Sequence, residues 1–135
     1  MTSHSIEGKV VLIAGGAKNL GGLIARDLAQ QGAKAVAIQA DLTTAAAVEK
    51  LFADAIAAVG KPDIAINTVG KVLKKPITEI SEAEYDEMSA VNAKTAFFFI
   101  KEAGKQVNDN GKLLTLVTLV TLDWFEELMD AHLEA

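Results

Sequence analysis

The sequence contains no cysteine, which excludes disulfide bonds and metal sites built on thiolates. Its two histidines, His4 and His132, lie near opposite ends without ligand spacing around them, so we expect no metal site. No apolar run approaches the roughly 18 residues of a membrane span. The polar start "MTSHSIEGK" also lacks the apolar region of a signal peptide, and we therefore expect a cytoplasmic protein without membrane contact.

The chain also lacks an excess of positive charge. Its 13 Lys and Arg residues face 18 Asp and Glu residues, giving a net charge of −5, and no basic cluster occurs. A nucleic-acid partner is therefore not expected. With 135 residues, half of them hydrophobic, residues 1–135 are expected to form a single domain with its own core.

Apolar runs alternate with helical patterns from one end to the other. Short runs typical of buried strands occupy 9–14, 33–38, 63–69 and 112–120. Helical spacing of apolar residues occupies 19–31, 43–59, 81–99 and 123–134. This alternation predicts an α/β fold, a three-layer α/β/α sandwich around a four-stranded parallel sheet. Right-handed crossovers favour the strand order 2-1-3-4.

The helix ends carry recognisable signals. Ser81 and Glu84 form a predicted capping box, and Ile80 is placed to pack against Tyr85. A last helix, capped by Asp123, has apolar residues on one side and acidic residues on the other. The first helix covers only half of one sheet face in this topology, so we expect the last helix to cover the other half.

A glycine-rich turn connects the first strand to the first helix. Gly15 and Gly16 end the strand, and Gly21 and Gly22 lie in the first turns of the helix. Such a turn lets a phosphate reach the free backbone N–H groups of a helix N-terminus. The alternative is that the glycines serve only a tight turn and close packing of helix on sheet.

Four segments in order resemble the short-chain dehydrogenase/reductase family. Residues 14–21 resemble its T-G-x-x-x-G-x-G turn, although Ala14 replaces Thr and Asn19 replaces the middle Gly. The other three are "ADLT" (40–43), "NTVG" (67–70) and "VNAKTAFF" (91–98), the last with the family's Asn at Asn92. The resemblance runs from about residue 8 to residue 118. It implies a Rossmann-like domain that binds a dinucleotide.

The resemblance also implies which residues contact the cofactor. They are Gly15, Lys18, Asn19, Leu20, Gly21, Asp41, Asn67 and Gly70. Lys18 resembles the basic residue that holds the 2′-phosphate of NADP, whereas Asp41 could accept the ribose hydroxyls of NAD. Lys18 could instead be a solvated surface residue, and Asp41 could cap the following helix. We favour weakly bound NADP, with NAD as the alternative.

The chain departs from the family in two places. Gly21 and Asp41 are only 20 positions apart, so a strand and helix unit of about 30 residues is missing between them. The Tyr-x-x-x-Lys pair that moves the proton is also missing, because the single tyrosine, Tyr85, is followed four residues later by Ser89. A lone phenol titrates near pH 10 and is a poor base at neutrality. We therefore expect no catalytic residue, a packing role for Tyr85 and a local hydrogen bond for Asn92 within its helix.

Three functions remain open. The first is a shortened, engineered NAD(P)-binding domain without hydride transfer of its own. The second is a minimal scaffold without ligand, and the third is an NADP-dependent oxidoreductase that receives its proton donor from elsewhere. A homodimer is also considered, because Phe97, Phe98 and Phe99 cannot all face one sheet.

Overall fold

The computed structural model describes residues 5–15, 19–71 and 73–116. The strands are β1 (Val10–Ala14), β2 (Lys34–Ile38), β3 (Ile64–Asn67) and β4 (Lys112–Thr115). The helices are α1 (Asn19–Gln30), α2 (Ala45–Val59), α3 (Glu82–Met88) and α4 (Thr95–Gln106), with a π-helical segment η2 (Ser89–Lys94) and a 3-10 turn η1 (Ile77–Glu79). The predicted final helix from Asp123 and the end of the fourth predicted strand lie outside the described residues.

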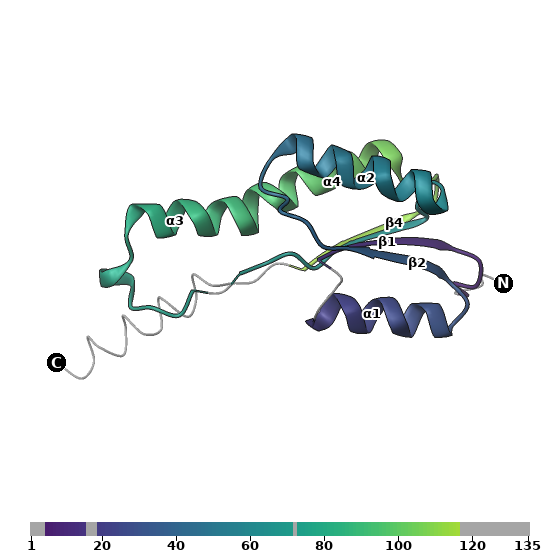
Figure 1. Ribbon diagram of the computed structural model, residues 1–135, viewed down its shortest axis with the longest axis horizontal. Helices are drawn as coiled ribbons and strands as arrows, with labels where there is room; N and C mark the ends of the chain where they lie inside the picture. The colour runs from purple at the N-terminus through teal and green to yellow at the C-terminus, as the bar shows by residue number, and fades with distance from the viewer. Residues whose placement is uncertain (1–4, 16–18, 72, 117–135) are drawn as a thin grey trace.

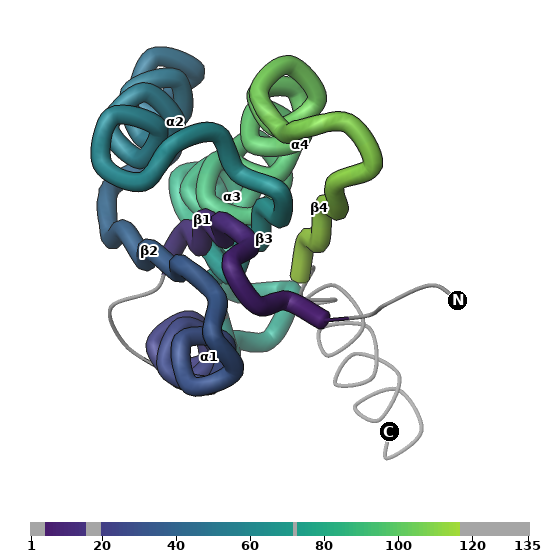
Figure 2. Tube along the Cα trace, turned by 90° about the vertical axis from the view of Figure 1, so that its right-hand side faces the viewer, coloured from purple at the N-terminus to yellow at the C-terminus, as the bar shows by residue number. Residues whose placement is uncertain are grey.

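The four strands form one parallel sheet in the order β2-β1-β3-β4, as the sequence predicts. The chain moves from β1 to one neighbour and then returns past it to β3. This reversal places α1 on one face of the sheet and α2 and α4 on the other, as Figures 1 and 2 show. The result is the predicted three-layer arrangement, with the strand order reversing beside β1.

The core is thicker on the face that carries two helices. Leu12 and Ala65 from the sheet pack there with Phe52 of α2 and Phe99 of α4, whose ring centroids are 5.2 Å apart. The opposite face holds a smaller cluster, in which Val11, Ile13 and Ile66 meet the inward side of α1. The strands buried on both faces therefore account for the uninterrupted apolar runs in the sequence.

Helix ends follow local chemistry. Thr44 caps α2 by accepting a hydrogen bond from Ala47 N at 3.2 Å, and Ser81 and Glu84 form the predicted capping box of α3. Thr44, rather than Asp41, is thus the cap of α2. Ile80 packs with Leu73 and Met88, whereas Tyr85 is 58% exposed. The predicted packing role of Tyr85 is therefore wrong.

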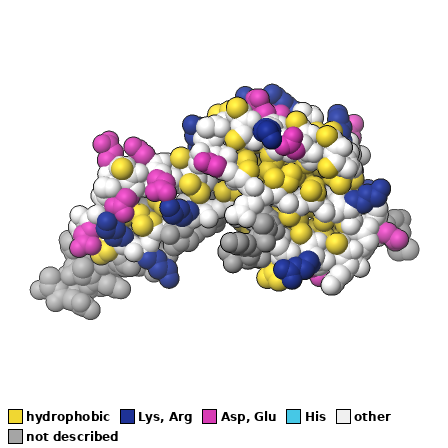
Figure 3. Space-filling model, in the orientation of Figure 1, with side chains coloured by type: hydrophobic (Ala, Val, Ile, Leu, Met, Phe, Trp, Pro, Cys, Tyr) yellow, Lys and Arg dark blue, Asp and Glu magenta, His cyan; other side chains and the backbone are white. Residues whose placement is uncertain are grey.

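Helix α3, η2 and α4 follow one another directly, and α3 projects beyond the end of the sheet (Figure 1). Charged side chains of both signs gather on this projecting part, while apolar side chains show between the layers of the body (Figure 3). On α4, Phe99 is fully buried but Phe97 and Ile100 are 65% and 47% exposed. An apolar surface suited to self-association is therefore present, and a homodimer stays a prediction.

Among the described residues, no helix is long and apolar enough to cross a membrane. The same part of the chain holds no group of three side chains suited to binding a metal ion. The cytoplasmic location stays a prediction.

Candidate dinucleotide site

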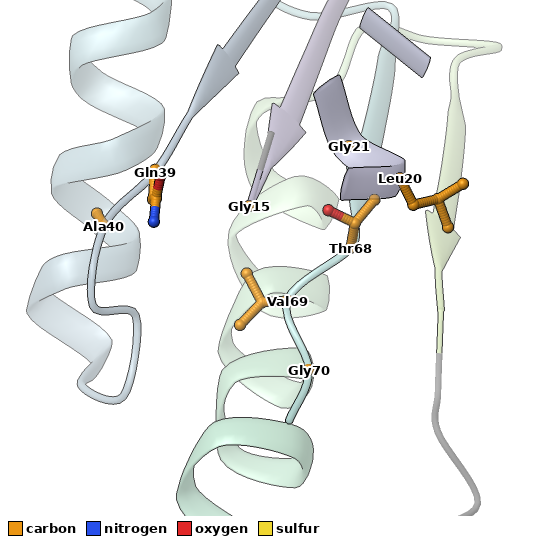
Figure 4. A pocket seen from close by; sticks show the side chains of 8 residues that line it. All are labelled: Gly15, Leu20, Gly21, Gln39, Ala40, Thr68, Val69 and Gly70. Carbon is orange, nitrogen blue, oxygen red and sulfur yellow. The ribbon is translucent and has the colours of Figure 1, made fainter. Parts of the chain in front are cut away.

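A cavity of about 310 Å³ opens at the carboxyl ends of β1, β2 and β3. Such crevices, where the strand order reverses, are where open parallel sheets bind ligands. Figure 4 shows its lining, which comprises Gly15, Leu20, Gly21, Gln39, Ala40, Thr68, Val69 and Gly70. Four of these eight residues, Gly15, Leu20, Gly21 and Gly70, were predicted from the sequence.

Gly15 lies at a tight point of this lining. Its φ is +82°, and a Cβ there would lie 2.9 Å from Thr68 Oγ1 and 3.2 Å from Val69 Cγ2. The Thr68 hydroxyl is itself fixed, because it donates to Ala14 O at 2.7 Å. Gly15 N donates to Ile38 O at 2.9 Å, which holds the ends of β1 and β2 together. Only glycine satisfies both the backbone conformation and the space.

Helix α1 begins at Asn19, directly beside the cavity. The first turn of a helix has backbone N–H groups without helical partners and a partial positive charge, and here Leu20 and Gly21 of that turn line the cavity. The turn is therefore suited to an anionic group. Lys18 and the neighbouring Gly16 lie outside the described residues, and for Asn19 the structure gives only its place at the start of α1.

The β2 side of the cavity is closed by Gln39 and Ala40. The next residue, Asp41, is exposed, and its carboxylate accepts hydrogen bonds from Thr43 Oγ1 at 2.7 Å and Thr43 N at 3.1 Å. These bonds from Thr43 lower the pKa of Asp41. Asp41 is therefore turned toward its own loop and is not part of the cavity lining.

Asn67 ends β3 and is fully buried. Its Oδ1 accepts from Val69 N at 3.0 Å, so the side chain shapes the turn that lines the cavity but does not line it. Its Nδ2 and the hydroxyl of Thr115, the residue paired with it on β4, are buried without hydrogen-bond partners among the described residues. Unpaired buried donors are costly, so this end of the sheet retains polar groups that the described fold does not satisfy.

Asn92 lies in the π-helical segment η2 and reaches across to the strand-end loop. Its Nδ2 donates to Lys71 O at 2.9 Å, and its Oδ1 accepts from Lys71 N at 2.8 Å. These two hydrogen bonds join Asn92 to the backbone of a residue 21 positions away, so the predicted local hydrogen bond within the helix is wrong. Asn92 instead fixes the loop just after Gly70, and the irregular winding of η2 is typical of functional sites in helices.

None of the eight lining residues can exchange a proton near neutral pH. Tyr85 lies on the projecting helix α3, is exposed and is absent from the lining. Two lysines of the nearby loop are engaged elsewhere, because Lys71 pairs with Glu87 and Lys75 pairs with Glu84 at 3.0 Å. The described part of the chain therefore provides a crevice without an acid or base among its lining residues.

Four lining residues were missed by the sequence analysis: Gln39, Ala40, Thr68 and Val69. Each lies one or two positions beyond the carboxyl end of an observed strand, β2 or β3. Asking which residues stand at the carboxyl ends of neighbouring parallel strands would have found them.

Comparison with known proteins identifies relatives over most of the chain. A family model described as "Enoyl-(Acyl carrier protein) reductase" matches residues 5–129. A dehydrogenase structure from Burkholderia cenocepacia with bound NADP is 61% identical, with a TM-score of 0.80, over 87% of this chain and 55% of that one. A short-chain dehydrogenase from Oenococcus oeni is 41% identical, with a TM-score of 0.72, over 93% of this chain and 65% of that one.

A curated relative, elsinochrome reductase 1 from Elsinoe fawcettii, is 28% identical over 86% of this chain and 53% of its own length. The chain thus spans about half the length of the curated relatives it matches. Residues 5–129, which the family model matches, contain the glycine turn and the sheet described above.

Proposed function

The chain belongs to the short-chain dehydrogenase/reductase family, and from this premise we propose that it binds NADP(H) in the cavity beside Gly15 without catalysing hydride transfer by its own residues. The observation that carries the proposal is the composition of the cavity wall. It combines a helix N-terminus and glycine backbone, which suit a pyrophosphate, with no group that moves a proton among the described lining residues.

The phosphate end of the dinucleotide fits the turn between β1 and α1. Gly15 leaves the backbone uncovered, and the first turn of the 12-residue helix α1 points its free N–H groups toward the cavity. A Cβ at Gly15 would disturb Thr68 and Val69, which form the opposite wall. The adenosine end would then lie toward Gln39 and Ala40, at the end of β2.

The β2 end favours NADP over NAD. An acidic residue placed there would accept the ribose hydroxyls of NAD and repel the 2′-phosphate of NADP. Here Gln39 and Ala40 line the cavity, while the Asp41 carboxylate is held by Thr43. A contact of Lys18 with the 2′-phosphate, which the family resemblance implies, would add to this preference. Bound NADP in the structure from Burkholderia cenocepacia is consistent with it.

Binding is expected to be weak. The cavity of about 310 Å³ is near the lower end of the roughly 300–1,000 Å³ range of small-molecule pockets, so it accommodates only part of a dinucleotide. We expect a dissociation constant between the high micromolar and millimolar range, which corresponds to a binding free energy of about 4–6 kcal/mol in magnitude. NADP(H), when bound, supplies the hydride chemistry, and this chain contributes orientation through Gly15, α1 and the loop held by Asn92.

We further infer that the chain is a shortened, engineered form of the family fold. The segment after β2 leads directly to Asp41 and α2, where the family resemblance calls for another strand and helix. A second candidate function is an NADP-dependent oxidoreductase whose proton donor comes from another chain. It is favoured only by family membership, since the described cavity wall contains no acid or base.

Thermal unfolding with NADPH or NADH tests the proposal. A ligand that binds only the folded state raises the midpoint by mass action, and we expect a larger rise with NADPH at millimolar concentration. No rise with either cofactor at that concentration would identify a scaffold without ligand. Oxidation of NADPH in the presence of ketones, if it is lost in Tyr85→Phe, would show that the chain catalyses hydride transfer. It would then contradict the proposed absence of catalysis.

A further inference from the structure

The sheet face that carries α1 is only half covered by the described residues. Ile66 of β3 points to this face and is 7% exposed. Its register partner on β4, Leu114, lies on the same face but is 48% exposed. Leu116, two residues further along, continues the row and is 44% exposed. The β4 side of this face is therefore an uncovered apolar strip.

A second apolar wall faces the strip from α1. Leu20 and Leu23 lie one helical turn apart and are 51% and 61% exposed. In Figure 4, Leu20 points away from Gln39 and Ala40, on the Thr68 side of the cavity. The inward side of α1, with Ile24 and Leu28, packs under the sheet. The flank of α1 and the exposed row of β4 thus border the uncovered part of this sheet face, which is named the groove.

Two lysines lie at the amino end of this groove. Lys112 is the register partner of Ile64, and Lys9 lies two residues before Val11, so both lysines belong to the α1 face. They line one depression together with Asp63, whose carboxylate is already bound to Val10 N and Asn108, and with the exposed Asp109. Neither lysine forms an ion pair with a described carboxylate.

We propose that residues 123–135 of this same chain occupy the groove as a helix that runs antiparallel to β4. The sequence of the segment fits both walls, with apolar residues at helical spacing: Trp124, Phe125, Leu128, Met129 and Leu133. Its acidic side carries Glu127, Asp130 and Glu134. Running away from the carboxyl end of β4, the helix brings Glu134 and its negative dipole end toward Lys9 and Lys112.

The lengths agree with this placement. A 12-residue helix spans about 18 Å, and the five residues from Lys112 to Leu116 span about 16 Å. Six residues separate Leu116 from Asp123, a common length for a connection from a strand to a helix. So short a tether keeps the segment at a high effective concentration, which favours it over a second copy of the chain.

Trp124 is the only tryptophan, so its fluorescence reports directly on the proposal. In the unmodified chain we expect emission at short wavelength and several-fold weaker acrylamide quenching than in urea, both independent of protein concentration. Leu114→Lys, in the groove, should shift the emission to longer wavelength and restore quenching. Leu113→Lys is the matched control, because Leu113 is 39% exposed but faces the α4 layer and should change neither.

Leu128→Lys changes the segment instead of the sheet, and it should expose Trp124 while the circular dichroism of the body is retained. It therefore tests the contact even if Leu114→Lys fails to fold. Full quenching of Trp124 in the unmodified chain would overturn the proposal. Protection that appears only as a dimer forms would assign the groove to a second copy, and equal effects of Leu113→Lys and Leu114→Lys would exclude a contact specific to the α1 face.

Discussion

The two ends of the sheet use the same strands in different ways. At the amino ends, the Asp63 carboxylate accepts from Val10 N at 2.9 Å and from Asn108 Nδ2 at 3.0 Å, so β1, β3 and the turn before β4 are joined. At the carboxyl ends, Gly15 and Gly70 line an open cavity, and Asn67 Nδ2 has no partner among the described residues. One end is closed by hydrogen bonds that hold the fold, while the other is open and keeps a buried amide without a partner among the described residues.

The comparison also separates binding from catalysis. The glycine turn and the start of α1 are assembled at the carboxyl end, but the only tyrosine lies outside the cavity on α3. The described cavity wall thus has an open helix N-terminus but no residue that could serve as a proton donor. Substitutions at the two ends should show this difference, because those at the carboxyl end affect both stability and NADPH binding.

The largest effect is expected for Gly15→Ala. The positive φ costs about 1–2 kcal/mol, and displacement of the Thr68 hydroxyl adds about 1–2 kcal/mol more. We also expect NADPH to bind about tenfold more weakly, a change of about 1.4 kcal/mol. Urea unfolding and an NADPH titration measure the two effects.

Gly8→Ala is the matched control for Gly15→Ala. Gly8 has a similar φ of +75°, but a Cβ there meets nothing within 4 Å, and it precedes β1 at the amino end. It should lose only the conformational term of about 1–2 kcal/mol and retain NADPH binding. Equal losses in both variants would show that the contact of Gly15 with Thr68 is unimportant.

Asn92→Ala should have the next largest effect. Removing both hydrogen bonds to the Lys71 backbone should lower the free energy of unfolding by about 1–3 kcal/mol. It should also weaken NADPH binding, since Gly70 adjoins the released loop. Asn92→Asp keeps the acceptor for Lys71 N and should lose less than Asn92→Ala in urea unfolding. An unchanged free energy of unfolding in Asn92→Ala would contradict the role of Asn92 in fixing the loop after Gly70.

Asp63→Asn should reduce stability by about 1–2 kcal/mol at neutral pH without changing NADPH binding. The hydrogen bonds from Val10 N and Asn108, with Lys9 nearby, lower the pKa of Asp63. A lowered folded-state pKa means that the stabilisation is present above the unfolded value of about 3.9 and is lost as pH falls through the folded value.

The unmodified chain should therefore lose stability below about pH 4 more steeply than Asp63→Asn does, as measured by urea unfolding at several pH values. Asp86→Asn, an exposed change on α3 that removes one carboxylate without touching the bonds of Asp63, is the matched control. Identical profiles for the unmodified chain and Asp63→Asn would show that Asp63 does not provide this acid sensitivity.

The smallest effect is expected for Tyr85→Phe. Tyr85 is exposed and absent from the cavity, so we expect stability within about 0.5 kcal/mol of the unmodified chain and equal NADPH affinity. Thermal unfolding with and without NADPH measures both quantities. A clear loss of cofactor affinity would place Tyr85 at the cofactor site and contradict the separation of cofactor binding from catalysis.

Much of the fold could be predicted because its signals are local. The apolar run ending at Ala14 and the glycine at Gly32 fixed the expected bounds of β1 and α1, and the crossover rule gave the strand order. Ser81 and Glu84 likewise predict the start of α3, where they form a capping box. Gly15 could be selected as a site residue because the strand-turn-helix context restricts its chemistry.

The remaining features depend on contacts between distant residues. The bonds from Asn92 to Lys71 cross 21 positions, and no local pattern distinguishes the π-helical winding of η2 from α-helix. Asp41 could bind a ribose or cap a helix by its type alone, but the Thr43 hydroxyl decides where its carboxylate points. The spacing of Ile80 and Tyr85 predicts a contact between their side chains, but Ile80 packs against Met88 and Leu73 instead.

Titration of the ¹⁵N-labelled chain with NADPH, followed through its amide resonances, tests the central claim most directly. We expect saturable shifts of Gly15, Leu20, Gly21 and Gly70 at the carboxyl end, with a dissociation constant between the high micromolar and millimolar range and weaker shifts with NADH. Residues at the amino end, such as Asn110 and Lys112, should stay unchanged. Shifts confined to the amino end, or none at millimolar NADPH, would contradict it.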